Sequence, residues 1–281
     1  MIMLRFYSKI FQGFRYVLLV WHKSNAVKDQ AFQQSSRPSP QDIMATLLGD
    51  AYRGSGVLIN LMGVGAIFCA IVPLAISELA SSILFFGIAE VVLMGLILLV
   101  LRDVRKLKQR WLDSRRLAEV ERYSQIQDST SGSIDSMRLA TYQLLGGQDC
   151  QIRYNFLKQQ QYHLMEISSE RVGLVGFGIC LIAAATHLIV HFEWLILFTA
   201  FLPAVVGALH GINAFLQLGA LSDEHRKMGE RLNEIRSALE IAFDNDDLIT
   251  AKAIVFDLYE LLIVRHTEWR DVALRINVRA H

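Results

Sequence analysis

Four polar side chains lie inside long apolar stretches of the chain: Asn60, Glu90, His210 and Asn213. A polar group in such surroundings is costly unless it has a partner. The carboxyl of Glu90 could bind protons or cations, and an imidazole such as that of His210 can exchange protons. The four residues are therefore candidates for a pore lining or a proton-sensitive gate. The structural alternative is a hydrogen bond between neighbouring helices, with Glu90 neutral.

The spacing of these residues predicts which of them meet. His210 and Asn213 are three residues apart and share one helix face with Gly207. Asn60 lies near the corresponding end of its own stretch and could contact Asn213. Glu90 lies near the opposite end, which argues against a direct contact with His210.

Catalytic and metal-binding patterns are missing from the sequence. It contains no phosphate-binding glycine loop, no GxSxG nucleophile elbow and no HExxH zinc motif. The cysteines Cys69, Cys150 and Cys180 form no CxxC pair. His187 and His191 have the spacing of metal ligands, but the simpler interpretation is a pair of membrane-interface residues. We therefore predict no catalytic residue, metal or cofactor, and an enzyme is not expected.

The composition shows which elements must position the polar residues. Apolar residues make up 53% of the 281 residues and charged residues 20%, and the two classes are segregated along the chain. None of the 28 lysines and arginines lies within 54–101 or 172–221. Crossing a bilayer takes roughly 20 apolar residues in a helix. Four stretches qualify: Gly56–Ile76, Ile83–Leu101, Val172–Val190 and Trp194–Leu216. The predicted fold is an all-α integral membrane protein with four transmembrane helices in two hairpins.

The positions of the basic residues predict the topology. Seven lysines and arginines precede the first hairpin, twelve separate the hairpins and nine follow the second, whereas the turns around Glu78 and Glu193 have none. By the positive-inside rule, both termini and the central region are cytoplasmic. The net charge of +1 argues against a nucleic-acid partner.

The first 53 residues divide into two parts. Residues 1–23 predict an amphipathic helix at the membrane interface, with Arg5, Lys9 and Arg15 on its cationic face. These charges also argue against a cleaved signal peptide. Residues 24–53 predict a polar, proline-containing linker and a lead-in to the first hairpin at 54–101.

Long helices are expected on the cytoplasmic side, at 102–171 and 222–281. The second span is predicted to continue from Ile83 to about Gln127 as one helix. Its basic start includes Arg102, Arg105 and Lys106, which together with Arg5, Lys9 and Arg15 are the candidates for lipid headgroup contacts. Trp111 is expected to pack against another cytoplasmic helix.

The second hairpin, at 172–221, is expected to continue directly into a helix with a heptad seam. The seam consists of Leu221, His225, Met228, Leu232, Ile235, Leu239 and Ala242. Three heptads favour helix-on-helix packing or a coiled coil. The acidic segment 244–247 ends this helix, and a last helix folds back onto the seam or onto another subunit. The candidates for oligomerisation or partner binding are Trp111, Met228, Leu232, Ile235, Leu239 and Trp269.

A resemblance to a known family adds a functional expectation. The segment RWLDSRRLAEVER (110–122) resembles the stalk of SLATT-type bacterial transmembrane effectors, and 151–178, 201–212 and 225–240 are similar to the second hairpin of longer relatives. The resemblance implies an inner-membrane protein that oligomerises and permeabilises the membrane to stop phage infection. The longer relatives carry a Rossmann-type sensor domain, for which 1–53 has no room. Sensing would then involve a separate cytosolic protein or a nucleotide second messenger.

Three functions follow from these features. The first is a membrane effector of antiphage defence in the bacterial cytoplasmic membrane, a homo-oligomer in contact with lipids. The second is a membrane-anchored scaffold or regulator that recruits a cytosolic protein through the helices of 222–281. The third is a small ion or solute transporter. Two features argue against it: the spans contain few polar groups, and the two hairpins form a parallel repeat, since both are predicted to begin and end inside, whereas inverted repeats are common in transporters.

Overall fold

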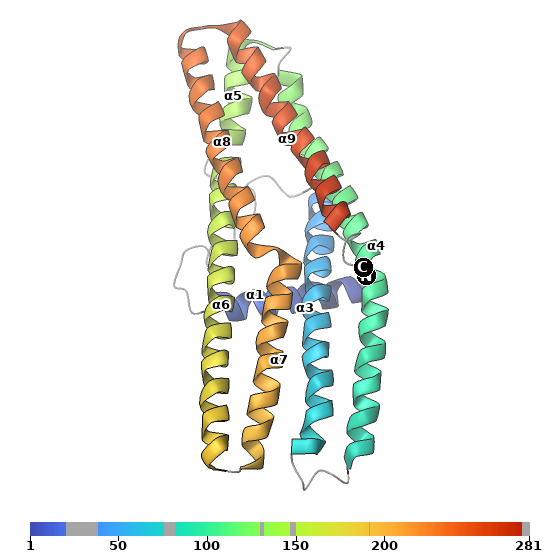
Figure 1. Cartoon of the computed structure of the whole chain (residues 1–281). Coiled ribbons are helices and arrows are strands. Elements are labelled where there is room, and N and C mark those ends of the chain that lie inside the picture. Colours follow the sequence, from blue (N-terminus) through green and yellow to red (C-terminus); the bar gives the residue numbers. More distant parts are fainter. Residues whose placement is uncertain (21–38, 76–81, 130–131, 147–149, 191, 277–281) are drawn as a thin grey trace. The chain divides into compact units, whose positions relative to one another are not determined.

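The computed structural model describes residues 1–20, 39–75, 82–129, 132–146, 150–190 and 192–276 (Figure 1). These residues form helices and no strands. The helices are α1 (Ile2–Leu19), α3 (Pro40–Ala75), α4 (Ile83–Ser129), α5 (Ile134–Leu145), α6 (Gln151–Ile189), α7 (Glu193–Leu216), α8 (Leu218–Asp244) and α9 (Leu248–Ile276). Four helical stretches, which include the apolar parts of α3, α4, α6 and α7, are long and apolar enough to cross a membrane, as predicted. The chain therefore has the helices of a multi-pass membrane protein.

Local sequence explains where several helices begin and how far they extend. α4 contains no proline and runs for 47 residues from Ile83, as the sequence predicts. Ser133 precedes α5, and its hydroxyl accepts a hydrogen bond from the Ser136 N–H at 3.3 Å. Asp247 precedes α9, and its carboxylate accepts bonds from the N–H and the hydroxyl of Thr250 at 3.0 and 2.6 Å. The predicted turn around Glu78 and much of the predicted linker at 24–53 lie outside the described residues.

The chain divides into two compact units. Unit 1 comprises 1–23, 47–109 and 163–219, and unit 2 comprises 24–46, 110–162 and 220–281. Within unit 1, α3 and α7 pack antiparallel along their length. The rings of Tyr52 and Phe215 lie 5.1 Å apart near one end of the pair. Those of Phe68 and Phe201 also lie 5.1 Å apart, sixteen residues further along α3.

The other two apolar helices of unit 1, α6 and α4, lie on either side of this pair: α6 contacts α7, and α4 contacts α3. On α6, a Cβ at Gly176 would lie 3.0 Å from Val206 of α7, and the Cys180 thiol donates to the Thr199 carbonyl at 3.7 Å. α4 contacts α3, because Phe86 packs against the buried Val72. The order of the helices in unit 1 is therefore α6, α7, α3, α4 (Figure 1).

Most apolar side chains of these helices face outward. In the most apolar 18-residue windows of the four stretches, only 28%, 6%, 11% and 6% of residues are buried. Leu84 and Leu98 of α4 are 77% and 68% exposed, and Ile182 of α6 is 70% exposed. Exposure of so many large apolar residues is costly in water but favourable against lipid chains.

Unit 2 has a conventional buried core instead. The seam residues Met228, Leu232, Ile235 and Leu239 of α8 are buried there. They pack in one cluster with α4, α5, α6 and α9, whose members include Tyr123, Met137, Ile152, Val255 and Leu258. The predicted helix-on-helix packing of the seam therefore occurs within one chain. Their apolar faces are covered by this packing, which argues against these four residues as candidates for oligomerisation or partner binding.

The fourth span leads into the seam helix through a break of one residue. α7 ends at Leu216, and Gln217 has left-handed backbone angles, φ 53° and ψ 44°. Gly219 follows in the first turn of α8, where the Glu166 carboxylate occupies the position that a Cβ would take. A carboxylate is favourable beside the positive end of a helix dipole. This tertiary contact favours a new helix start over continuation.

Candidate functional site

Asn60 connects the two central helices of unit 1. Its amide Nδ2 donates to the Gly56 carbonyl one turn earlier on α3, at 2.9 Å. This bond directs Oδ1 towards α7, where it lies in the position that a Cβ on Gly211 would occupy. The sequence predicts a contact of Asn60 with Asn213. The structure instead places Asn60 against Gly211, two residues earlier on the same helix.

Asn213 and His210 lie on the next part of α7. Among the described residues, no hydrogen-bond donor reaches the buried Oδ1 of Asn213. His210 is exposed, and its Nε2 lies 3.7 Å from the position of a Cβ on Gly173 of α6. The α7 segment Gly211–Asn213 thus lies where α3 and α6 approach α7, and it carries an unsatisfied polar atom.

Glu90 lies apart from this group. It falls between Phe86 and Leu93 on α4, both of which contact α3. Its side chain is half-buried, and within the described part of the chain no hydrogen bond or ion pair reaches its carboxylate. The helix registers place it level with Phe201 of α7. That position is nine residues, or about 13 Å, from His210 along the helix axis.

A buried lysine near the ends of the spans is not among the residues that the sequence patterns single out. Lys108 is only 6% exposed, and its Nζ lies 5.8 Å from the centre of the Tyr52 ring. Burial lowers the pKa of Lys108, because the charged form loses hydration. Val104, Lys108 and Leu112 are four residues apart and share a helix face, which is the signal that could have identified it.

Unit 2 contains a second polar group that the sequence did not reveal. Glu119 of α4 is 1% exposed and lies 2.5 Å from an Nη atom of Arg115. Burial of Arg115 acts to lower its pKa, but Glu119 and a hydrogen bond with Tyr154 outweigh burial and raise the pKa. The guanidinium thus stays charged inside the unit.

His225, a predicted seam residue, is held by three residues of α6. Its Nδ1 lies 2.8 Å from the Asn155 Oδ1, while the Asn155 amide donates to the Gln151 carbonyl at 2.8 Å. The second bond fixes the orientation of the Asn155 amide, so Nδ1 of His225 carries a proton. The ring stacks on Tyr162 at 5.7 Å and meets Tyr154 edge-on at 6.0 Å. The arrangement suits helix packing in the core of unit 2.

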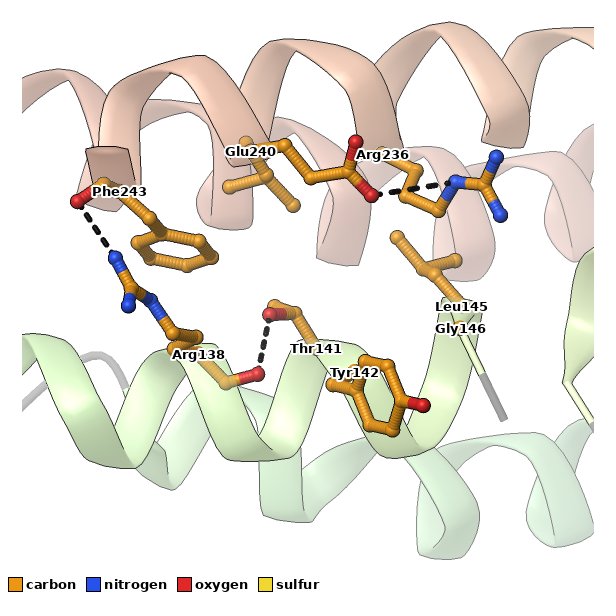
Figure 2. A pocket seen from close by; sticks show the side chains of 9 residues that line it. Arg138, Thr141, Tyr142, Leu145, Gly146, Arg236, Glu240 and Phe243 are labelled. Carbon is orange, nitrogen blue, oxygen red and sulfur yellow. Dashed lines mark hydrogen bonds and ion pairs between the residues drawn. The ribbon is translucent and has the colours of Figure 1, made fainter. Parts of the chain in front are cut away.

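A shallow pocket lies between α5 and α8 in unit 2 (Figure 2). Arg138 donates to the Phe243 carbonyl at 2.6 Å, and its guanidinium lies 5.4 Å from the centre of the Phe243 ring. The second arginine, Arg236, lies 3.7 Å from a carboxylate oxygen of Glu240. Because both arginines already contact acceptors of the chain, the pocket serves packing of α5 on α8.

The remaining candidates are placed as follows. The lipid candidates Arg5, Lys9, Arg102, Arg105 and Lys106 are exposed, whereas Arg15 is half-buried. Trp111 is half-buried in unit 2. The side chain of Trp269 and residue His191 lie outside the described part of the chain, so the interpretation of His187 and His191 as membrane-interface residues stays a prediction. The described residues contain no group of three potential metal ligands.

Comparisons with protein-family models, with curated proteins and with solved structures found no match for the chain.

Proposed function

We propose that the chain is an effector of antiphage defence in the bacterial cytoplasmic membrane, which opens a leak through its transmembrane helices when it is triggered. The proposal rests on the resemblance of 110–122 to SLATT-type stalks and on the polar residues of unit 1. The observation that carries it is the buried Oδ1 of Asn213, one helical turn from His210 on α7, which has no hydrogen-bond partner among the described residues. Water or an ion that enters between the helices would supply the missing partner.

The arrangement in the membrane is part of the proposal. The two hairpins would leave both termini and the long helices of unit 2 in the cytoplasm, as the positive-inside rule predicts from the basic residues that flank the spans. Copies would associate through the outward apolar faces of unit 1, since the α8 seam is buried within unit 2. A separate cytosolic sensor or a nucleotide second messenger would act on unit 2.

The test is induced expression in cells that carry a membrane-potential dye, with and without phage. We expect depolarisation with the natural chain and a several-fold smaller signal with Asn213→Leu. Thr186→Val is the matched control, because it removes a polar group from the exposed face of α6. A natural chain that never depolarises the membrane, even with phage or a partner protein present, contradicts the proposal.

Glu90→Gln separates two roles of the carboxylate. A pore or proton role predicts an altered leak at normal expression, because the amide cannot ionise. A packing role predicts an unchanged leak and a small change in stability at most. Both are read in the same dye assay, with the amount of protein measured in the membrane fraction.

A scaffold that recruits a cytosolic protein is the second candidate, and one feature of α9 favours it. Ile249 and Phe256 are seven residues apart on one helix face and are 83% and 61% exposed, although unit 2 has its own core. The full-length chain should then retain a soluble protein that Phe256→Asp releases while the dye signal stays unchanged. Retention of only further copies of the chain would favour the effector.

A further inference from the structure

Helix α1 has two apolar faces, and the protein covers only one of them. Tyr7, Phe11 and Leu18 are 3–4% exposed and form the covered face. On the other side, Ile2, Phe6 and Val17 are 86%, 55% and 61% exposed. Positions 2, 6 and 17 fall on one side of a helix, so these three side chains form one stripe. An ordinary amphipathic surface helix would carry polar residues there.

The covered face fixes α1 against α3. The Tyr7 carbonyl occupies the position that a Cβ on Gly54 would take, so the two backbones touch where the helices cross (Figure 1). The Gln12 amide donates to the Asp50 carboxylate at 3.4 Å, and the Arg53 guanidinium lies 5.6 Å from the centre of the Phe11 ring. These contacts involve both backbone and side chains over one turn of α3.

This attachment sets the level of α1 along the spans. Gly54 lies two residues before the first apolar stretch, which begins at Gly56. Asp103 of α4 lies close enough to raise the pKa of Tyr7, secondarily to the burial of the tyrosine, and it comes two residues after the second stretch ends at Leu101. α1 therefore lies at the common end of two spans, where a bilayer passes from hydrocarbon to headgroups.

Exposed basic residues lie on α1 and on the neighbouring part of α4. Arg5 and Lys9 are exposed on α1 itself, and Arg102, Arg105 and Lys106 are exposed at the same end of α4. A stripe of aliphatic and aromatic residues flanked by cations matches the boundary between acyl chains and anionic headgroups. A water-facing surface would not need the apolar stripe, and a purely hydrocarbon-facing surface would exclude the cations.

We propose that the outward face of α1 binds anionic phospholipid, with Phe6 and Val17 in the acyl boundary and Arg5 and Lys9 on the phosphates. The inference rests on the membrane arrangement in the proposed function and is independent of any leak. α1 is then a strap that joins the headgroup layer to α3, six residues from Asn60.

The experiment measures where the stripe lies. Nitroxide labels at Phe6→Cys and Val17→Cys, in the full chain with its three natural cysteines replaced by serine, are studied in vesicles of phosphatidylglycerol and phosphatidylcholine. At both labels, collisions with oxygen should be more frequent than collisions with a water-soluble nickel chelate. The ratio of the two collision rates should lie between the ratio for Leu98→Cys in α4 and the ratio for Glu234→Cys in α8. Chelate collisions as frequent as at Glu234→Cys would place the face in water and overturn the proposal. A label that neither reagent reaches would show a protein cover and overturn it as well.

A charge variant tests the lipid class separately. Arg5→Gln with Lys9→Gln should reduce the phosphatidylglycerol that copurifies with the protein by about fivefold for each charge removed, relative to phosphatidylcholine. Arg231→Gln with Arg236→Gln removes two charges from α8 and should leave the retained lipid unchanged. Equal losses from the two pairs would reject the headgroup contact. A chain without any leak could still pass both tests, so failure of the effector function is distinguishable.

Discussion

Two glutamates on one helix show how differently the two units treat a carboxylate. Glu119 of α4 lies in unit 2, is 1% exposed and pairs with Arg115 at 2.5 Å. Glu90 of the same helix lies in unit 1, is half-buried and has no hydrogen bond or ion pair among the described residues. Unit 2 compensates a buried charge with a countercharge, as a water-soluble core must. Unit 1 gives Glu90 no countercharge among its described residues, so we expect a partner for this carboxylate, or a function, that a single copy of the chain does not provide.

The leucines show the same contrast. Leu232 of α8 is fully buried in unit 2, whereas Leu98 of α4 is 68% exposed in unit 1. Exposed charges on α8 pair along the helix, for example Arg226 with Asp223 at 2.6 Å and with Glu230 at 2.9 Å. The two units therefore follow opposite rules for apolar residues, which is expected when one contacts lipid and the other water.

Truncation of the two leucines tests this contrast with the largest expected effect. Leu232→Ala should lower the free energy of unfolding by about 4 kcal/mol, because it removes a fully buried side chain and leaves a cavity. Leu98→Ala should cost less than about 0.5 kcal/mol, since lipid fills the space. Reversible unfolding in mixed micelles measures both variants. A similar cost at the two positions would mean that another protein surface covers Leu98.

Removal of the glutamates tests the charge rule. Glu119→Ala should destabilise the protein by about 3 kcal/mol, because the mostly buried Arg115 loses its countercharge. Glu90→Ala should leave stability unchanged or increase it slightly, because a costly polar group is removed from an apolar surface. Thermal unfolding followed by circular dichroism measures both. A large loss with Glu90→Ala would reveal a partner for Glu90 and would make its role structural.

The sequence predicts the parts of the fold that depend on one helix at a time. The four apolar stretches, the length of α4 and the helix end at the acidic segment 244–247 all follow from local composition, and the structure has them. The break at Gln217 does not, because glutamine is an ordinary helix residue and the contact of Glu166 with Gly219 comes from another helix. The burial of Glu119 is invisible for the same reason.

The sequence predicts the candidate site of unit 1 to a similar extent. The sequence places Asn60, His210 and Asn213 near the same end of their apolar stretches and Glu90 near the opposite end. The contacts that these side chains make depend on the rotation of each helix about its axis and on the close approach of α3 at Gly211. Neither can be predicted from the sequence of one helix alone. Heptad spacing identifies the apolar seam of α8, but it does not distinguish packing within a chain from packing between copies.

A glycine substitution tests the close approach in unit 1 with a smaller effect. Gly211→Ala should destabilise the protein by about 1–2 kcal/mol, since the new methyl group overlaps the Asn60 Oδ1. In an Asn60→Ala background the cost should disappear, because the overlapping atom is gone. Gly207→Ala is the matched control on α7, since no atom lies within 4 Å of its Cβ position. A full cost in the Asn60→Ala background would show that another contact determines the packing there.

The start of α9 gives the smallest effect and tests whether unit 2 lies in water. The hydroxyl and the N–H of Thr250 both donate to the Asp247 carboxylate, and these bonds lower the pKa of Asp247. A lowered pKa in the folded state means that the carboxylate contributes stability above the unfolded value of about 3.9. The contribution is lost as the pH falls through the folded value. Asp247→Ala should therefore lower the unfolding temperature slightly at neutral pH and flatten its fall in acid. Asp257→Ala, on the exposed face of the same helix, should change neither. If Asp247→Ala leaves the acid dependence intact, the capping carboxylate does not titrate as an exposed group, and unit 2 is not the water-facing half of the comparison.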